Sequence, residues 1–222
     1  MNNLSARMRL RASVAMVPMG EDRWQFFLGN TRTTRYYRLR RELADAIKQL
    51  DGRITLAEVA DRTSADPNSL EALARTLRQS CVLEDGSWAE RVASSPWRRV
   101  LNFIGDYIPC NDLEAAFARL SATTVVILGV GAVGSWVATQ LCQSGISRLV
   151  LVDSDIVEIS NLNRSLFTQT DVGRYKVDAL LQRLVSINPG LIGRLLKQRI
   201  TDAGELAGLL QDTGPTTIVV NC

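Results

Sequence analysis

The stretch VVILGVGAVGSWVATQL, Val125 to Leu141, joins an apolar run, a glycine turn and the start of a helix. Its pattern is G-x-G-x-x-G: Gly129 permits a tight turn, Gly131 lets backbone approach a phosphate, and Gly134 lets the helix pack on the strand. The unpaired amides at the start of such a helix attract anionic oxygens. The stretch therefore predicts a strand, turn and helix that bind the phosphates of a nucleotide.

The segments around this stretch predict a parallel sheet. From Thr123 onward the order is strand, helix, strand, loop and helix, followed by a short terminal strand, TTIVVNC. Strands that alternate with helices form a parallel sheet with helices on its faces. Asp153 ends the strand RLVLVD, where a carboxylate can accept hydrogen bonds from ribose hydroxyls. The glycine turn and this acid fit a NAD-dependent dehydrogenase equally well.

The sequence after Asp153 favours a different family. It reads DSDIVEISNLNRSLFTQTDVGRYKVDALLQRLVSINP. Together with the glycine turn it resembles the ThiF/MoeB family, the ATP-dependent adenylating fold shared with ubiquitin-activating enzymes. The family signature combines the glycine turn with D-x-D-x-V-x-x-S-N-L-x-R and a later V-G-x-x-K. The resemblance spans Val125 to Cys222, and it departs from the family at Ser165, where glutamine is common.

The resemblance implies formation of an acyl adenylate, in which a carboxylate attacks the α-phosphorus of ATP and pyrophosphate leaves. It implies ATP and Mg²⁺ as cofactors, and it makes Arg164 and Lys176 the catalytic residues that stabilise charge on the leaving pyrophosphate. In the family the arginine commonly comes from a second subunit, which implies a homodimer. An alternative role for Asp155 is to cap the following loop. For Trp136 we expect packing or interface contact rather than base stacking. The residues assigned to the nucleotide are Gly129, Gly131, Ala132, Gly134, Asp153, Asp155, Ser160, Asn161, Asn163, Arg164 and Lys176.

Two expected features of the family lie beyond this sequence. The family's magnesium-binding aspartate follows the strand TIVVNC, and the chain stops at Cys222, so no metal ligand is assigned. Because Cys81, Cys110, Cys142 and Cys222 form no C-x-x-C pair, we expect thiols here and a structural Zn²⁺ only in a missing C-terminal part. We therefore expect this chain to be truncated, to bind ATP weakly and to show no pyrophosphate exchange by itself.

The N-terminal half has a different pattern. RLRASVAMVPMGEDRWQFFLGN places two apolar runs around a turn, which predicts a hairpin. Three short helices are then predicted from apolar residues at helical spacing. These are Leu43, Ile47, Leu50, Leu56, Val59, Leu70, Leu73 and Leu77. We predict a small α+β, winged-helix-like domain at 1–92, a linker and lead-in helix at 93–122, and a Rossmann-like α/β adenylation domain at 123–222.

The N-terminal unit resembles in architecture the peptide clamp of microcin C-type adenylating enzymes. That resemblance implies a leader peptide bound as an added strand on an exposed sheet edge. The predicted function is adenylation of a carboxylate on a ribosomally made precursor peptide. One alternative is an activator of sulfur-carrier or ubiquitin-like proteins, and another is a non-catalytic peptide-binding or DNA-binding winged-helix protein.

Composition and charge narrow the possible mechanisms, locations and partners of the protein. The chain has 222 residues, 46% of them hydrophobic, a net charge of +3 and no histidine, which excludes Ser-His-Asp and Cys-His catalysis. No apolar run is long enough for a membrane span and no signal peptide is visible, so we expect a cytoplasmic protein. The basic stretch Arg32 to Arg41 fits a solvated strand and helix start, or a dock for an acidic leader. A nucleic-acid partner is disfavoured because residues 51–71 are rich in Asp and Glu.

Overall fold

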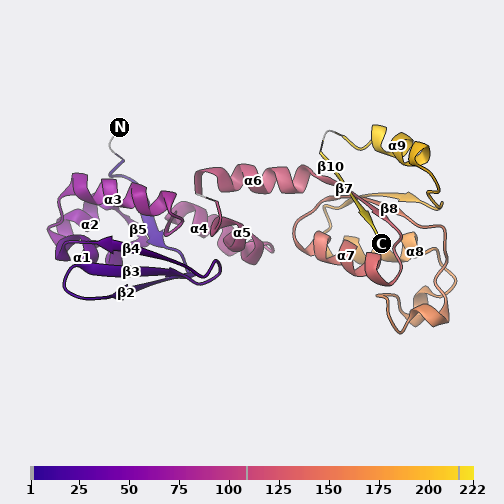
Figure 1. The fold of residues 1–222 in the computed structure, drawn as a ribbon, viewed down its shortest axis with the longest axis horizontal. Coiled ribbons are helices and arrows are strands. Elements are labelled where there is room, and N and C mark those ends of the chain that lie inside the picture. Colours follow the sequence, from indigo (N-terminus) through magenta and orange to yellow (C-terminus); the bar gives the residue numbers. More distant parts are fainter. Residues whose placement is uncertain (1–2, 109, 215) are drawn as a thin grey trace. The chain divides into compact units, whose positions relative to one another are not determined.

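The computed structural model describes residues 3–108, 110–214 and 216–222 (Figure 1). The chain divides into two compact units, Met1–Ala115 and Ala116–Cys222, called unit 1 and unit 2 below. Each unit is described by itself. An α+β unit thus precedes a parallel α/β unit, as the sequence predicts.

Unit 1 contains two antiparallel sheets. One has the order β5-β1-β6 and the other the order β2-β3-β4. Their strands are β1 (Arg7–Leu10), β2 (Val14–Pro18), β3 (Arg23–Leu28), β4 (Thr33–Arg38), β5 (Asp51–Thr55) and β6 (Leu83–Asp85). The predicted hairpin is confirmed, because β2 pairs antiparallel with β3. The apolar run before its turn is two strands rather than one, since β1 ends at Leu10 and pairs with β5 and β6.

The helices of unit 1 begin where the sequence carries capping residues. They are α1 (Arg41–Gln49), α2 (Leu56–Thr63), α3 (Pro67–Gln79), α4 (Gly86–Ala93) and α5 (Arg98–Gly105). Thr55 and Glu58 form a capping box at α2, and Asp66 caps α3, which starts with Pro67. The first three helices are those predicted from the helical spacing, and they bury their apolar faces with β3 in one core. The largest fully buried side chains include Phe26, Ile47, Leu56, Leu70, Leu77 and Leu83.

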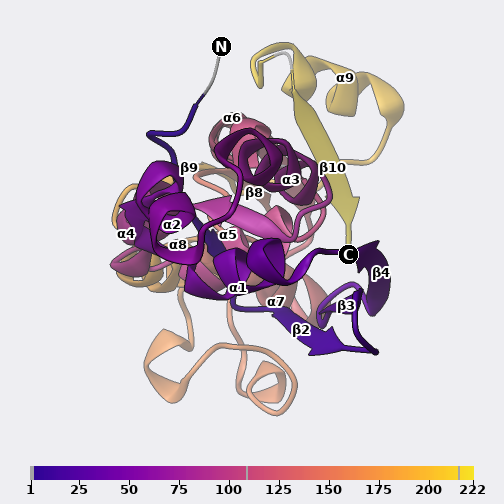
Figure 2. The same cartoon turned by 90° about the vertical axis from the view of Figure 1, so that its left-hand side faces the viewer.

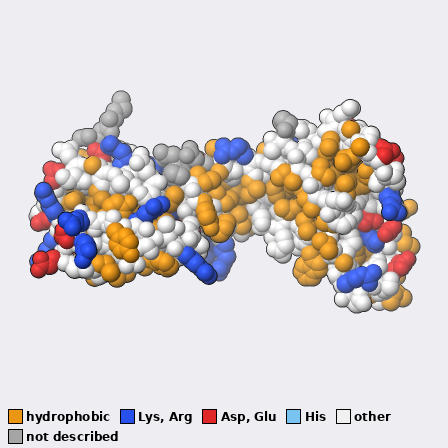
Figure 3. Space-filling view, viewed as in Figure 1, with side chains coloured by type: hydrophobic (Ala, Val, Ile, Leu, Met, Phe, Trp, Pro, Cys, Tyr) orange, Lys and Arg blue, Asp and Glu red, His pale blue; other side chains and the backbone are white. Residues whose placement is uncertain are grey.

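The basic stretch Arg32 to Arg41 forms β4 and the start of α1, as predicted, and its role as a solvated surface or as a dock for an acidic leader stays a prediction. On the face drawn in Figure 3, Lys and Arg side chains over this part of unit 1 are mixed with Asp and Glu.

The segment predicted as a linker and lead-in helix contains α5 and α6 (Cys110–Ala122). Cys81 and Cys142 are buried and Cys222 is exposed, and none of these three forms a disulfide with a described residue, while the side chain of Cys110 is outside the described part.

Unit 2 is a four-stranded parallel sheet with the order β10-β7-β8-β9. Its elements are β7 (Thr124–Leu128), α7 (Ala132–Gln143), β8 (Arg148–Val152), α8 (Lys176–Ile187), β9 (Ile192–Leu196), α9 (Ala203–Gln211) and β10 (Thr217–Asn221). The predicted strand, turn and helix at Val125 to Leu141 are confirmed as β7 and α7. The sequence prediction missed β9 and α9. Gly193 lies in β9 and two glycines lie in α9, and glycine weakens the periodic signal of both elements.

The connection between β8 and α8, residues 153–175, is the longest irregular segment of unit 2. It contains two short 3₁₀ helices, Ile159–Asn161 and Gln169–Asp171. Figures 1 and 2 both show this orange segment projecting away from the sheet. The carboxyl ends of the parallel strands and the start of α7 lie at the same edge of the sheet, which is where ligands bind in open α/β folds.

Candidate functional site

The three glycines of the turn have different surroundings. Gly129 has a φ of +83°, and a Cβ there would lie 2.6 Å from the carbonyl oxygen of Cys222. A Cβ on Gly134 would overlap the carbonyl oxygen of Gly129. A Cβ on Gly131 would instead meet no described heavy atom within 4 Å. The first and third glycines therefore fit the predicted turn and helix packing, and Gly131 borders open space that a phosphate could occupy.

Asp153 ties the glycine turn to the end of β8. Its Oδ2 accepts a hydrogen bond of 2.9 Å from the backbone N–H of Val130, and its Oδ1 accepts one of 2.8 Å from that of Asp155. Each carboxylate oxygen has a further lone pair for another donor. The ribose contact stays a prediction, and the observed role is to fix the turn.

Lys176 and Asp155 form an ion pair of 2.8 Å between Nζ and Oδ2. The side chain of Lys176 is only 11% exposed and that of Asp155 is 65% exposed, so the lysine is no free surface cation. The hydrogen bond from Lys176 lowers the pKa of Asp155 below its ordinary value, and the charge of Arg199 adds to this. The carboxylate therefore pairs with α8, where the alternative prediction had it cap the loop.

A cavity of 590 Å³ lies at the carboxyl ends of the strands of unit 2. It brings together some of the predicted residues, namely Gly129, Gly131, Asp153, Asp155 and Lys176. It also contains residues that the sequence analysis missed, namely Arg199, Ile200, Asn221 and Cys222. The last two end the predicted strand TTIVVNC, so the rule that parallel strands end at one edge could have found them. Arg199 follows the missed strand β9 and had no signal of its own.

The other predicted residues do not line this cavity. Ala132 and Gly134 lie in the first turn of α7, which no side chain caps in the described structure. Ser160, Asn161 and Asn163 lie in the projecting β8–α8 connection. Asn161 accepts a hydrogen bond from the backbone of Glu158 at 3.0 Å, which is the behaviour of a turn-forming residue.

Arg164 is exposed and turned toward its own loop. Its Nη1 donates to the carbonyl oxygen of Ser160 at 2.6 Å and to Oδ1 of Asn163 at 3.1 Å. The structure of one chain therefore does not bring this predicted catalytic arginine to the cavity that holds Lys176.

The residues of the cavity fit a nucleotide. Lys176 and Arg199 supply positive charge, Gly131 leaves open space, and the uncapped start of α7 offers backbone donors.

Within the described residues, no three His, Cys, Asp or Glu side chains gather as metal ligands. Among those residues, none of the helices combines the length and apolar character that crossing a bilayer requires.

Residues 111–222, about half of the chain, match the model of the ThiF family. The chain belongs to the ThiF family. The glycine turn is therefore that of a ThiF-family protein, and the dehydrogenase alternative is set aside.

Proteins of more than one kind are similar in sequence to this ThiF-family chain. Ubiquitin-like modifier-activating enzyme 5 of Arabidopsis thaliana is 38% identical over 124 residues, which are 56% of this chain and 27% of that protein. The tRNA threonylcarbamoyladenosine dehydratase of Bacillus subtilis is 48% identical over 71 residues, 32% of this chain and 28% of that protein. The chain thus spans little more than a quarter of the length of these relatives.

Two solved structures share the fold of nearly the whole chain. E. coli MccB, solved with AMPCPP and MccA, has a TM-score of 0.70 and 20% identity, and the match covers 91% of this chain and 59% of that one. PaaA has a TM-score of 0.69 and 25% identity, with 93% of this chain and 65% of that one covered. The fold likeness therefore includes unit 1, which lies mostly outside the ThiF match.

Proposed function

We propose that this chain takes part in the ATP-dependent adenylation of a carboxylate on a ribosomally made precursor peptide, with the leader peptide held by unit 1. The observation that carries the proposal is the extent of the fold likeness. The structural match to MccB covers 91% of this chain, whereas the match to the ThiF family model begins at residue 111. MccB, described as a microcin C7 biosynthetic enzyme, has been solved with N-formylated MccA and with ATP.

We propose that the parts of the nucleotide follow the order of the strands along the cavity. Along the carboxyl edge, the glycine turn follows β7, Asp153 follows β8, and Arg199 with Ile200 follows β9. If the phosphates lie at the start of α7 near Gly131 and Ala132, the ribose lies beside Asp153. The base then lies toward Arg199 and Ile200, because β9 is on the far side of β8 from β7.

The chemistry needs no nucleophile from the protein, because the substrate carboxylate attacks the α-phosphorus and pyrophosphate leaves. The protein contributes fixed positive charge around the phosphates, and Lys176 is proposed to supply it because this cation lines the cavity. Mg²⁺ in nucleotide sites is held by one or two carboxylates and the phosphates, so the exposed carboxylate of Asp155 fits it. A bound Mg²⁺ ion would neutralise part of the charge of the phosphates.

Arg164 requires a second copy of the chain in this proposal. It is exposed, and in its own chain it binds loop atoms outside the cavity. A projecting connection of one protomer can carry Arg164 to the cavity of its partner. We therefore propose a homodimer in which this arginine acts across the interface.

The leader peptide is proposed to pair with β4, an edge strand of the β2-β3-β4 sheet. Edge strands present unpaired backbone groups, and an extended peptide can add to them as a further strand. Arg35 and Arg38 on β4 are exposed, and Tyr36 is 69% exposed. These side chains favour a leader that carries acidic and apolar residues.

A second candidate function is activation of a ubiquitin-like protein. The 38% identity to ubiquitin-like modifier-activating enzyme 5 favours it, although that match covers only 56% of this chain. The two candidates share the nucleotide site and differ in the carboxylate that is activated, which is a peptide side chain or terminus in one and a protein tail in the other.

The proposed function is tested by binding to the purified chain. Calorimetry should show ATP with magnesium binding more tightly than NAD. Labelled leader peptides encoded beside the gene should bind in fluorescence anisotropy. They should bind about tenfold more weakly to Arg35→Ala/Arg38→Ala, whereas the exposed off-strand control Arg62→Ala should match the unmodified chain. Tighter binding of NAD, or no binding of any neighbouring peptide, would contradict the proposal.

A further inference from the structure

Unit 1 contains a second charged cavity, away from its β4 edge. It has a volume of 440 Å³ and lies between α4 and α5. Arg9, Arg98 and Arg99 line it together with Asn102, and no Asp or Glu is among its described lining residues. The rest of its wall is apolar and consists of Ala12, Ala89, Val92 and Ala93. This cavity is called the arginine groove below.

The three arginines of the groove are not equivalent. Arg9 is already paired, since its Nε donates to Oε1 of Glu84 at 2.7 Å and its Nη2 lies 2.6 Å from the same oxygen. Arg98 and Arg99 are exposed in the first turn of α5, and neither forms an ion pair or a side-chain hydrogen bond with any described residue. Two guanidinium groups of the groove are therefore available to a ligand.

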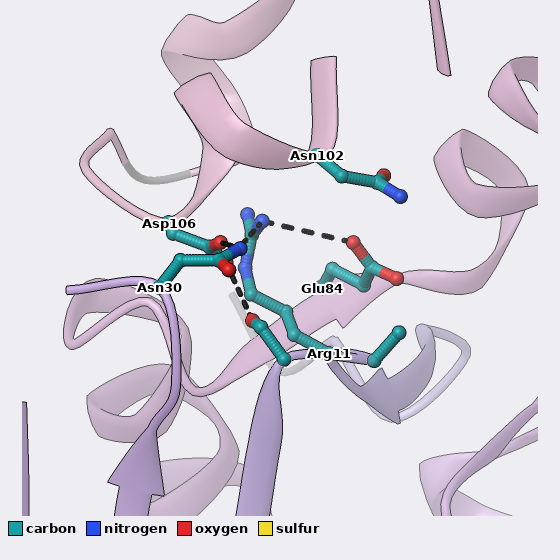
Figure 4. Close-up of a pocket in the computed structure, with 7 residues that line it drawn as sticks. Arg11, Asn30, Glu84, Asn102 and Asp106 are labelled. Carbon is teal, nitrogen blue, oxygen red and sulfur yellow. Dashed lines mark hydrogen bonds and ion pairs between the residues drawn. The ribbon is translucent and has the colours of Figure 1, made fainter. Parts of the chain in front are cut away.

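A buried network holds α5 in place from its other end (Figure 4). Asp106, which follows α5, accepts hydrogen bonds from Ser13 at 2.7 Å and from the side chain of Asn30. Arg11 lies between Asp106 and Glu84, with its Nη1 3.8 Å from a carboxylate oxygen of each. The side chains of Arg11, Glu84 and Asp106 are 3%, 4% and 3% exposed. Buried charges that are paired in this way fix the elements that carry them.

Gly105 is necessary for this arrangement, because a Cβ there would overlap the guanidinium group of Arg11. The network surrounds a cavity of 230 Å³ that shares Ala12 and Asn102 with the arginine groove. Figure 4 shows Asn102 above Glu84 with no hydrogen bond drawn to it. The arginine groove is thus next to a paired buried network, and the side-chain amide of Asn102, which forms no hydrogen bond with a described residue, lines both cavities.

We propose that the arginine groove binds an acidic segment of a peptide. Arg98 and Arg99 bind its carboxylates, Asn102 bonds its backbone, and the alanine and valine wall packs against its apolar atoms. Guanidinium groups pair with carboxylates through two parallel hydrogen bonds, which gives strength and orientation. The identity of the occupant as part of the precursor peptide rests on the proposed function, whereas the site itself does not.

A nucleic acid fits the groove less well than a peptide. Binding to a phosphate backbone requires a row of cations along an open surface. The groove offers two available guanidinium groups over an apolar wall, and the carboxylate of Glu84 is held directly behind Arg9. A short segment that carries carboxylates and apolar atoms complements this surface in both charge and polarity.

The test uses a fluorescein-labelled octapeptide of glycine, serine and glutamate with the whole 222-residue chain, in fluorescence anisotropy. The comparison probes are the same peptide with glutamine in place of glutamate and a thymidine oligonucleotide of equal charge. Arg98→Ala and Arg99→Ala should each weaken binding of the glutamate peptide by about tenfold, the loss expected for a hydrogen bond to a charged group. Arg62→Ala, which removes an exposed charge elsewhere in unit 1, should change it by less than about twofold.

Several results would overturn the inference. These are equal binding of the glutamine peptide, an equal loss in Arg62→Ala, tighter binding of the oligonucleotide through the same two arginines, or a loss in Arg35→Ala instead. Circular dichroism of each variant checks folding, and Arg98→Gln and Arg99→Gln replace any alanine variant that unfolds. Binding of the glutamate peptide to this chain, together with no peptide-dependent pyrophosphate exchange by the full-length gene product, would support the groove and contradict the proposed function.

Discussion

Replacing Gly131 by alanine separates the nucleotide site from the stability of the fold. A Cβ at this position meets no described heavy atom within 4 Å, so no neighbouring atom blocks the methyl group. Gly131→Ala should cost less stability than Gly134→Ala, whose Cβ would overlap a backbone oxygen. The methyl group would occupy the space proposed for phosphate, so ATP should bind at least about tenfold more weakly, a loss of about 1.4 kcal/mol.

Gly134→Ala is the matched control for this prediction. Its Cβ would overlap the carbonyl oxygen of Gly129, so the backbone of the turn must move, at a cost of about 1 to 3 kcal/mol. The melting temperature of unit 2 should then fall by roughly 4 °C or more for each kcal/mol. Thermal melts and titrations with a fluorescent ATP analogue measure both quantities. Unchanged ATP affinity in Gly131→Ala, or a melting temperature as low as that of Gly134→Ala, would refute the reasoning.

Other substitutions at the site give further predictions. Asp153→Ala should lose about 1.5 to 3 kcal/mol of stability, because two backbone N–H groups lose a charged acceptor, and calorimetric melts check this. Arg199→Ala should weaken ATP binding by about tenfold in calorimetry, while Arg164→Ala leaves it within about twofold because the proposed role of Arg164 is to stabilise the leaving pyrophosphate rather than bound ATP. A larger effect of Arg164 in a single protomer would contradict the site. The lowered pKa of Asp155 means that its pairing with Lys176 stabilises the fold above the ordinary value of 3.8 and is lost as the pH falls through the folded pKa. The difference in melting temperature between Asp155→Asn and the unmodified chain should therefore be full near neutral pH and should close below pH 3.8; a constant difference would show that the carboxylate charge is irrelevant.

Much of the fold could be predicted because local signals were strong. The glycine turn at Val125 to Leu141 combines a buried strand, a positive φ and a close backbone approach, and each needs particular residues. The three helices after the hairpin were predicted from buried leucines at helical spacing. The edge elements β9 and α9 were missed, because exposed strands and glycine-containing helices show little periodicity.

The candidate site could be predicted only where residues lie close to a motif. Asp153 and Lys176 belong to the family signature, and both line the cavity. Arg199 reaches the same cavity from a different strand, and its place depends on the order of the sheet rather than on neighbouring residues. The buried network of Arg11 with Glu84 and Asp106 likewise joins residues 73 to 95 positions apart, which no local pattern indicates.

The central claim is that a precursor peptide supplies the carboxylate that is adenylated. The most direct measurement is the exchange of labelled pyrophosphate into ATP by the full-length gene product, with the precursor peptide and with a ubiquitin-like protein as separate substrates. The account predicts exchange that depends on the precursor peptide and is lost in Lys176→Ala. Exchange that depends only on the ubiquitin-like protein, or that is equal without any peptide, would contradict it.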